Sequence, residues 1–285
     1  MIARAATGLN VEINEAALRA FCARILGWAP DRTDAVEHAI DSIYLSIGRE
    51  AVLVLLGETD LVPLAQALHR RTFGDGQPFV VCDPQRGDLP STVRSPGNYK
   101  DGVAGFMAAT GGSLCVRHSR RPRDFSSVIA MVRDPSARVQ LIVCADVRRD
   151  ADPFITLPVP IRVPSLRTRT NELPRIVDEY AADAIAELKV PETSFTAADR
   201  QWVIKHAPMT LAEIEKATLR LVALNTSSSL PRAAELLGMA PVSLSRWLER
   251  WKQRPALARD LGASSQPPER SSPPATRGKR GRNRR

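Results

Sequence analysis

The residues whose types and spacing best suit a chemical task lie near the C-terminus, between Leu230 and Trp251. Small residues at Ala233 and Ala234 allow two helices to cross closely, and Gly238 allows the chain to turn within a few residues. The apolar residues of this segment repeat at helical spacing. The pattern predicts a helix-turn-helix built from two short helices, Leu230–Leu237 and Pro241–Trp251.

The second of these helices is expected to read DNA, because recognition helices contact base edges with their N-terminal residues. Ser243 and Arg246 are the predicted base contacts. The basic residues around them are predicted to contact phosphates, namely Arg232, Arg250 and Lys252. Ser245 and Trp247 complete the predicted outward face, and the predicted inner face comprises Leu237, Val242, Leu244 and Leu248. The alternative is an ordinary helical hairpin with a solvated basic face.

The same segment resembles the Fis-type helix-turn-helix that closes many bacterial transcription activators. The pattern of that family is met at Arg232–Ala234, Leu237–Met239 and Ser243–Trp247. The resemblance implies DNA as the partner. It also implies that the preceding helix, Met209–Leu224, packs against a second copy, so that a homodimer forms through the C-terminal helices at a two-fold-related site.

The positive charge of the chain is concentrated at its end. The 285 residues hold 40 lysines and arginines against 31 acidic residues, a net charge of +9 at pH 7. Residues 253–285 alone carry nine basic and two acidic side chains, among many prolines and serines. Such a composition cannot repay the entropy of ordering, so a disordered basic tail is predicted at residues 255–285. It is expected to add salt-sensitive affinity for DNA, and a purely solubilising tail is the alternative.

The elements that position this segment follow from hydrophobic periodicity. Apolar runs of four to six residues without polar alternation are typical of parallel strands buried on both faces. Strands are predicted at Ala51–Leu56, Pro78–Val81, Ser113–Val116, Val139–Cys144 and Val159–Val163. Helices are predicted at Glu15–Leu26, Asp34–Ile47, Leu61–Arg71, Gly102–Ala109 and Phe125–Arg133. The fold class is therefore predicted as α/β, with a sheet between two helix layers.

Beyond Pro164 only amphipathic helical patterns remain. They span Asn171–Leu188, Ala197–His206 and Met209–Leu224, ahead of the two short C-terminal helices. The predicted domains are an N-terminal extension (1–34), an α/β domain (35–165), an all-α lid (166–207), the helix-turn-helix domain (208–254) and the basic tail (255–285).

The α/β region resembles the AAA+ domain of sigma-54-dependent transcription activators. Five segments match the motifs of that family in the same order: Val52–Thr59, Leu64–Arg71, Pro78–Cys82, Gly105–Val116 and Val163–Pro174. The resemblance implies a P-loop-like three-layer domain followed by a helical lid.

The departures from that family fall on its catalytic positions. A phosphate loop needs glycines, a Lys for the β/γ oxygens and a Ser or Thr for magnesium, whereas only Asp60–Pro63 separates Thr59 from Leu64. Where the family has Asp-Glu to hold magnesium and polarise water, this chain has Arg117–His118. His118 is interpreted as structural rather than as a general base. The degenerate nucleotide site is thus assigned to Gly57, Glu58, Thr59, Asp60, Pro63, Arg117 and His118, with no catalytic residue, metal or cofactor expected.

Three further functional segments of that family are missing. The sigma-contacting loop is absent between Cys82 and Gly105, the arginine-finger region is reduced to Asp152–Thr156, and Pro208–Glu215 lacks the nucleotide-sensing arginine of the lid. Four cysteines without zinc-ligand spacing are expected to be reduced core residues: Cys22, Cys82, Cys115 and Cys144. The start of the chain lacks a signal-peptide pattern, which predicts a cytoplasmic protein of the bacterial nucleoid with no membrane partner.

Together these features predict a sequence-specific bacterial transcription regulator with a catalytically inactive ATPase-like domain. One alternative is an ATP-binding, sigma-54 activator-like ATPase that acts with an intact relative. Another is a protein that titrates such activators. RNA polymerase and related activators are candidate partners besides DNA.

Overall fold

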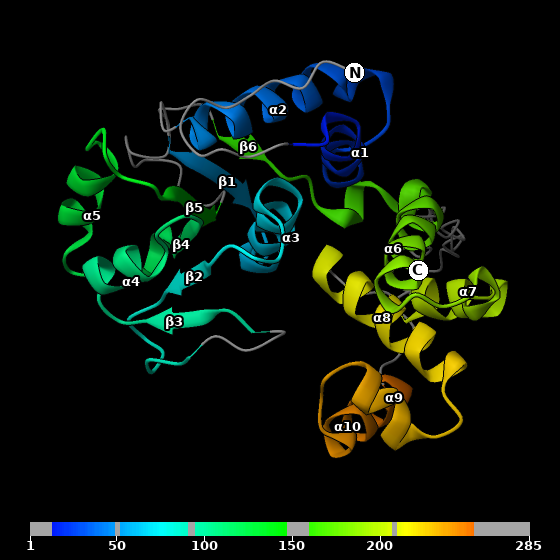
Figure 1. Cartoon of the computed structure of the whole chain (residues 1–285). Coiled ribbons are helices and arrows are strands. Elements are labelled where there is room, and N and C mark those ends of the chain that lie inside the picture. The colour runs from blue at the N-terminus through cyan, green and yellow to red at the C-terminus, as the bar shows by residue number, and fades with distance from the viewer. Residues whose placement is uncertain (1–12, 49–51, 91–94, 147–159, 207–209, 254–285) are drawn as a thin grey trace, which may run out of the picture.

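The computed structural model describes residues 13–48, 52–90, 95–146, 160–206 and 210–253. At its centre lies a parallel sheet of six strands in the order β3-β2-β4-β5-β1-β6 (Figure 1). The strands are β1 (Leu53–Gly57), β2 (Phe79–Cys82), β3 (Gly97–Tyr99), β4 (Ser113–Arg117), β5 (Gln140–Asp146) and β6 (Ile161–Arg162). The predicted α/β fold class is confirmed, and each of the five predicted strands has a counterpart.

Helices cover both faces of the sheet, as Figure 1 shows. On β1, Leu53 and Leu55 belong to one apolar cluster and Val54 and Leu56 to another, because successive side chains of a strand point to opposite faces. The first cluster is completed by α1 (Glu15–Leu26), α2 (Thr33–Ile47) and α3 (Val62–Phe73). The second is completed by α4 (Gly102–Ala108) and α5 (Phe125–Val132). Burial on both faces explains the uninterrupted apolar runs in the sequence.

The short edge strand β3 has no counterpart among the predicted strands. It contains no aliphatic run, and its buried polar residue is Asn98. The Asn98 amide donates hydrogen bonds to the backbone oxygens of Asp83 at 3.2 Å and Gly87 at 3.0 Å. The strand is therefore held by backbone pairing with β2 and by the Asn98 side chain, and neither leaves a hydrophobic pattern in the sequence.

The helical part comprises α6 (Leu173–Leu188), α7 (Ala197–Lys205), α8 (Leu211–Thr226), α9 (Leu230–Leu236) and α10 (Pro241–Gln253). α8 packs against α6 and α7 and also against α3 and α9. Leu244 and Trp247 of α10 belong to the same apolar cluster as the α1–α3 face of the sheet. One continuous apolar cluster crosses the boundaries predicted at residues 34, 165 and 207. The division into domains remains a prediction.

The N-terminal helix is tied to the helical part by buried charge. Arg24 of α1 forms ion pairs with Glu179 at 3.0 Å and Asp183 at 2.6 Å on α6. Arg71 of α3 pairs with the same Asp183 at 2.7 Å. Arg169 donates to the carbonyl oxygens of the last turn of α1, at residues 24 and 25. The described residues of the predicted N-terminal extension are therefore part of the core structure.

All four cysteines are buried and free, as expected from the sequence. The Sγ atoms of Cys115 and Cys144 lie 3.7 Å apart on neighbouring strands. Among the residues described, no helix has the length and apolar character that crossing a bilayer requires.

Candidate functional site

Two regions carry the residues singled out from the sequence, and the first is the carboxyl edge of the sheet. In a parallel sheet the strands end at one edge, so the residues that follow different strands meet there. The turn after β1 supplies Asp60, the residue after β2 is Asp83, and β4 ends at Arg117. The structure therefore brings together two parts of the predicted nucleotide site that are distant in sequence.

Ion pairs occupy this edge. Arg117 donates to Asp60 at 2.8 Å through Nη2 and to Asp83 at 3.0 Å through Nη1, and Arg120 donates to the same Asp83 oxygen at 3.1 Å. Asp83 is fully buried, with 0% exposure. Burial opposes the charge of Arg117, but the hydrogen bond and negative charge of Asp60 and the charge of Asp83 outweigh it, so its pKa is raised. The positive charge of Arg117 is thus balanced by two carboxylates within the chain.

The turn between β1 and α3 is short, because β1 ends at Gly57 and α3 begins at Val62. Gly57 ends the strand and is buried, Glu58 and Thr59 are exposed, and Pro63 lies in the first turn of α3. The backbone N–H of Val62 donates to Asp60 Oδ1 at 3.2 Å. A helix N-terminus attracts anions through its free N–H groups and its dipole. Here the anion at the N-terminus of α3 is the carboxylate of Asp60.

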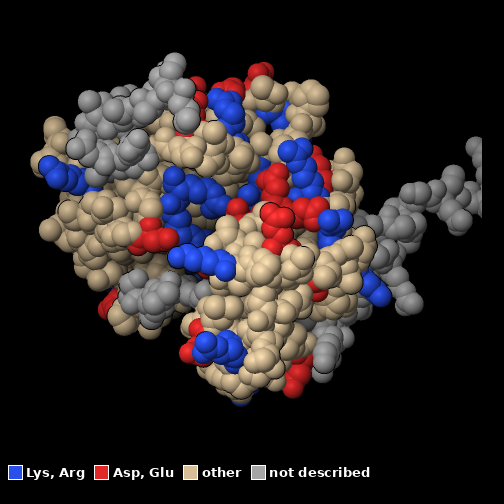
Figure 2. Space-filling view, turned by 45° about the vertical axis from the view of Figure 1, so that its right-hand side comes forward, with Lys and Arg blue, Asp and Glu red and all other residues tan. Residues whose placement is uncertain are grey.

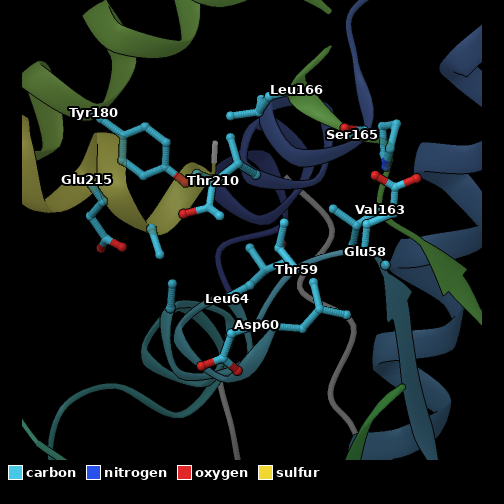
Figure 3. A pocket seen from close by; sticks show the side chains of 16 residues that line it. Glu58, Thr59, Asp60, Leu64, Val163, Ser165, Leu166, Tyr180, Thr210 and Glu215 are labelled. Atoms are coloured by element: carbon cyan, nitrogen blue, oxygen red, sulfur yellow. The ribbon is translucent and has the colours of Figure 1, made fainter. Parts of the chain in front are cut away.

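A small cavity lies beside this turn, between α3 and helices α6 and α8 (Figure 3). Its volume is about 30 Å³, against the several hundred Å³ of a typical ligand pocket. Three carboxylates line it, from Glu58, Asp60 and Glu215, and no lysine or arginine does. Burial raises the pKa of Glu215, although Arg70 pairs with it at 3.0 Å. The cavity is therefore small and lined by carboxylates, of which Asp60 pairs with Arg117 and Glu215 with Arg70.

His118 is buried at the start of a 3₁₀ turn, His118–Arg120, directly after β4. This burial agrees with the structural interpretation of the side chain. Sequence reasoning missed Asp83 and Arg120, which complete the ion-pair cluster. The available signal was an acidic residue placed directly after a buried strand, because such a residue lies at the carboxyl edge and needs a partner there.

The second region is the pair of helices α9 and α10. Gly238 has a φ of 61° in the turn between them, a conformation that glycine adopts readily. Ser229 caps α9 by accepting a hydrogen bond from the N–H of Arg232 at 3.4 Å. Ala233 and Ala234 are buried where the helices approach each other. The structure thus has a helix on each side of Gly238, and a helix-turn-helix that binds DNA remains a prediction.

Most of the predicted DNA-facing residues lie on the surface. Ser243, Arg246 and Arg250 are exposed, and Ser245 is half-buried. Arg250 Nε donates to the backbone oxygen of Arg246 at 3.2 Å. Arg232 is exposed on α9 and forms an ion pair with Glu235 at 2.6 Å. Lys252 belongs to the last turn of α10, and its side chain lies outside the described residues.

Two predicted orientations on α10 are wrong. Trp247 is only 5% exposed and packs against Trp202 of α7, with ring centroids 6.0 Å apart, and beneath the guanidinium of Arg220 of α8. Val242, expected inside, is 54% exposed. The buried stripe is set by Leu244 and Trp247, three residues apart, and a residue two positions before Leu244 falls on another face of the helix. Trp247 is therefore an anchor of α10 rather than a residue of its outer surface.

Basic side chains do not form one continuous patch on the face drawn in Figure 2, where acidic and basic residues lie side by side. The predicted basic tail, the arginine-finger segment at Asp152–Thr156 and part of the segment Pro208–Glu215 lie outside the described residues. The predicted dimer contact through α8 remains a prediction. Within the chain, the buried residues of α8, among them Ile214 and Ala217, already belong to the core.

No family model matches the chain, and no curated protein does. Matching solved structures include NtrX from Brucella abortus with ADP, at 14% identity, covering 84% of this chain and 72% of that one with a TM-score of 0.42. NtrX from the same organism with ATP matches at 15% identity, with coverages of 80% and 70% and a TM-score of 0.41. Likenesses this weak carry no conclusion about function.

Proposed function

We propose that this chain is a sequence-specific DNA-binding transcription regulator whose α/β domain does not hydrolyse ATP. The observation that carries the proposal is the contrast on α10. Leu244 and Trp247 fix one side of the helix in the core, while Ser243 and Arg246 stand exposed on its N-terminal half. Recognition helices present their contact residues in this way.

The anchoring matters because base reading needs a helix held in one orientation. Trp247 contacts α7 through Trp202 and α8 through Arg220. Arg246 forms no ion pair within the part of the chain that the structure describes, so its guanidinium is free to meet a guanine edge. To contact a phosphate, Arg232 must give up its ion pair with Glu235. This costs little, because an exposed ion pair contributes only about 0–1 kcal/mol to stability.

Loss of ATPase activity is proposed from the carboxyl edge of the sheet. Arg117 pairs with Asp60 and Asp83, and it stands where the activators that this chain resembles have an acidic residue for magnesium. The turn after β1 has its own carboxylate at the helix N-terminus, and the cavity beside it holds about 30 Å³. A triphosphate would meet the carboxylates of Glu58 and Asp60 there, the second already paired with Arg117, and no lysine lines the cavity.

Binding-site selection from random duplex DNA with the full chain tests the DNA-reading function. We expect a defined motif, whose symmetry will report whether two copies bind. Enrichment without a shared motif would refute sequence-specific reading. Deleting residues 256–285 in parallel should flatten the salt dependence of binding and leave the motif unchanged, because basic tails add affinity without specificity.

Equilibrium binding of a fluorescent ATP analogue tests the inactive domain. We expect no magnesium-dependent binding at micromolar concentrations, with an intact P-loop ATPase as the positive control. Micromolar binding would instead support the ATP-binding alternative, in which the chain acts with an intact relative. If the chain selects no DNA motif but binds an intact activator, the results would favour the alternative in which it titrates such activators. If the chain reads DNA, we also propose that it forms a homodimer, that it contacts RNA polymerase, and that it resides in the bacterial nucleoid.

A further inference from the structure

One exposed side chain near the start of α10 is not explained by the fold. Val242 is 54% exposed, at the second position of the helix. A β-branched residue is a weak helix former, and an exposed apolar side chain gains nothing from the core. Single exposed apolar residues are common on protein surfaces, and what distinguishes Val242 is its place beside Ser243 and Arg246 on the exposed face of α10.

The position of Val242 on the helix points to a partner instead. It lies in the N-terminal turn, the part of a recognition helix that approaches base edges. It precedes Arg246 by four residues, so the two side chains share one face. Ser243, beside it, is also exposed. The outer surface of α10 thus begins with an apolar group and continues with a hydroxyl and a guanidinium.

The major groove presents one apolar group, the C5-methyl of thymine, and the preferred partner of an arginine is guanine. We infer that Val242 reads the methyl group of a thymine in the DNA site, one helical turn from the base read by Arg246. Residues four apart are separated by roughly 6 Å along a helix, and stacked bases by about 3.4 Å. The thymine therefore stands about two base-pair steps from the base pair contacted by Arg246. This inference rests on the proposed DNA-reading function.

Replacing each thymine of the selected site in turn by deoxyuridine tests the assignment, because this change removes only the methyl group. For the unchanged protein we expect binding to weaken about three- to tenfold at one thymine of each half-site. Val242→Ala should bind the thymine and deoxyuridine duplexes equally at that position. Leu236→Ala, which truncates an exposed apolar residue of α9, is the matched control and should retain the discrimination.

The possible failures are distinguishable. A selected motif in which every thymine methyl is dispensable, or discrimination that persists in Val242→Ala, overturns the role of Val242 and leaves the DNA-reading function standing. A selection that yields no motif overturns both. Val242 is exposed, so the variant should fold normally, and an unchanged thermal unfolding curve verifies that any loss of binding is local.

Discussion

The carboxyl edge of the sheet and the outer face of α10 handle charge in opposite ways. At the sheet edge, Arg117 and Arg120 are paired with Asp60 and Asp83 inside the chain. On α10, Arg246 points to solvent while the opposite side of the helix is buried. The comparison teaches that charged groups paired inside the chain serve the fold, whereas an exposed guanidinium remains available to a partner. Function is better sought where polar groups lack an internal role.

The largest expected effect concerns the buried carboxylate. Asp83→Ala should destabilise the fold by about 3–5 kcal/mol, because it leaves three arginines, Arg86, Arg117 and Arg120, without their buried partner. Urea unfolding measures the loss, and Asp83→Asn, which keeps the size and an acceptor oxygen, should be less damaging. A loss below about 1 kcal/mol would mean that the edge is open to water and not filled.

The second prediction concerns α10. Ser243→Ala combined with Arg246→Ala should weaken specific DNA binding by about 1–3 kcal/mol for each good base contact. Stability should change by less than about 0.5 kcal/mol, since both residues are exposed. Lys216→Ala, which removes an exposed positive charge from α8, is the control and should preserve the motif. Unchanged specific binding of the double variant would remove the base-reading role from this face.

A third prediction separates the two regions by pH. His69 is buried on α3, with Nδ1 2.8 Å from Ser113 Oγ and Nε2 3.1 Å from the Gln77 oxygen. Burial lowers its pKa, so the folded state prefers the neutral ring. Stability is then complete above the ordinary histidine pKa of about 6.5 and is lost as the pH falls below it.

This loss should be seen in denaturant unfolding between about pH 7.5 and 5, and His69→Gln should reduce it. DNA binding by protein that remains folded should not change over this range, because residues 230–253 contain no histidine. An equal pH response of stability in the unchanged protein and the variant would assign the effect to other groups.

The smallest expected effect is at Asp60. Its side chain is 54% exposed, so Asp60→Asn should cost at most about 1 kcal/mol of stability, as for other exposed ion pairs. The variant should still fail to bind an ATP analogue, because Leu61, Val62 and Pro63 keep the turn unsuited to phosphate. If Asp60→Asn binds the ATP analogue, then the Asp60 carboxylate alone prevents nucleotide binding and the rest of the nucleotide site is intact.

Hydrophobic periodicity predicted most of the elements, since long apolar runs and amphipathic stretches encode burial directly. It missed β3, which depends on the hydrogen bonds of Asn98. It also missed the pairing of Arg117 with Asp83, because contacts between residues 34 positions apart follow from strand order and not from local pattern. The orientation of Trp247 could have been predicted by extending the buried stripe from Leu244 at helical spacing.

The central position of α8 has a practical consequence for anyone who wants the C-terminal helices alone. Because α8 packs on both α6 and α9, it connects the helical part of the chain to the C-terminal helices. A fragment cut just before α8 would expose Ile214 and Ala217 to water, and a fragment cut after it would strip Trp247 of Arg220. Neither cut leaves a self-contained module. In this chain α9 and α10 therefore cannot be moved to another protein without also redesigning the residues of α7 and α8 that they pack against.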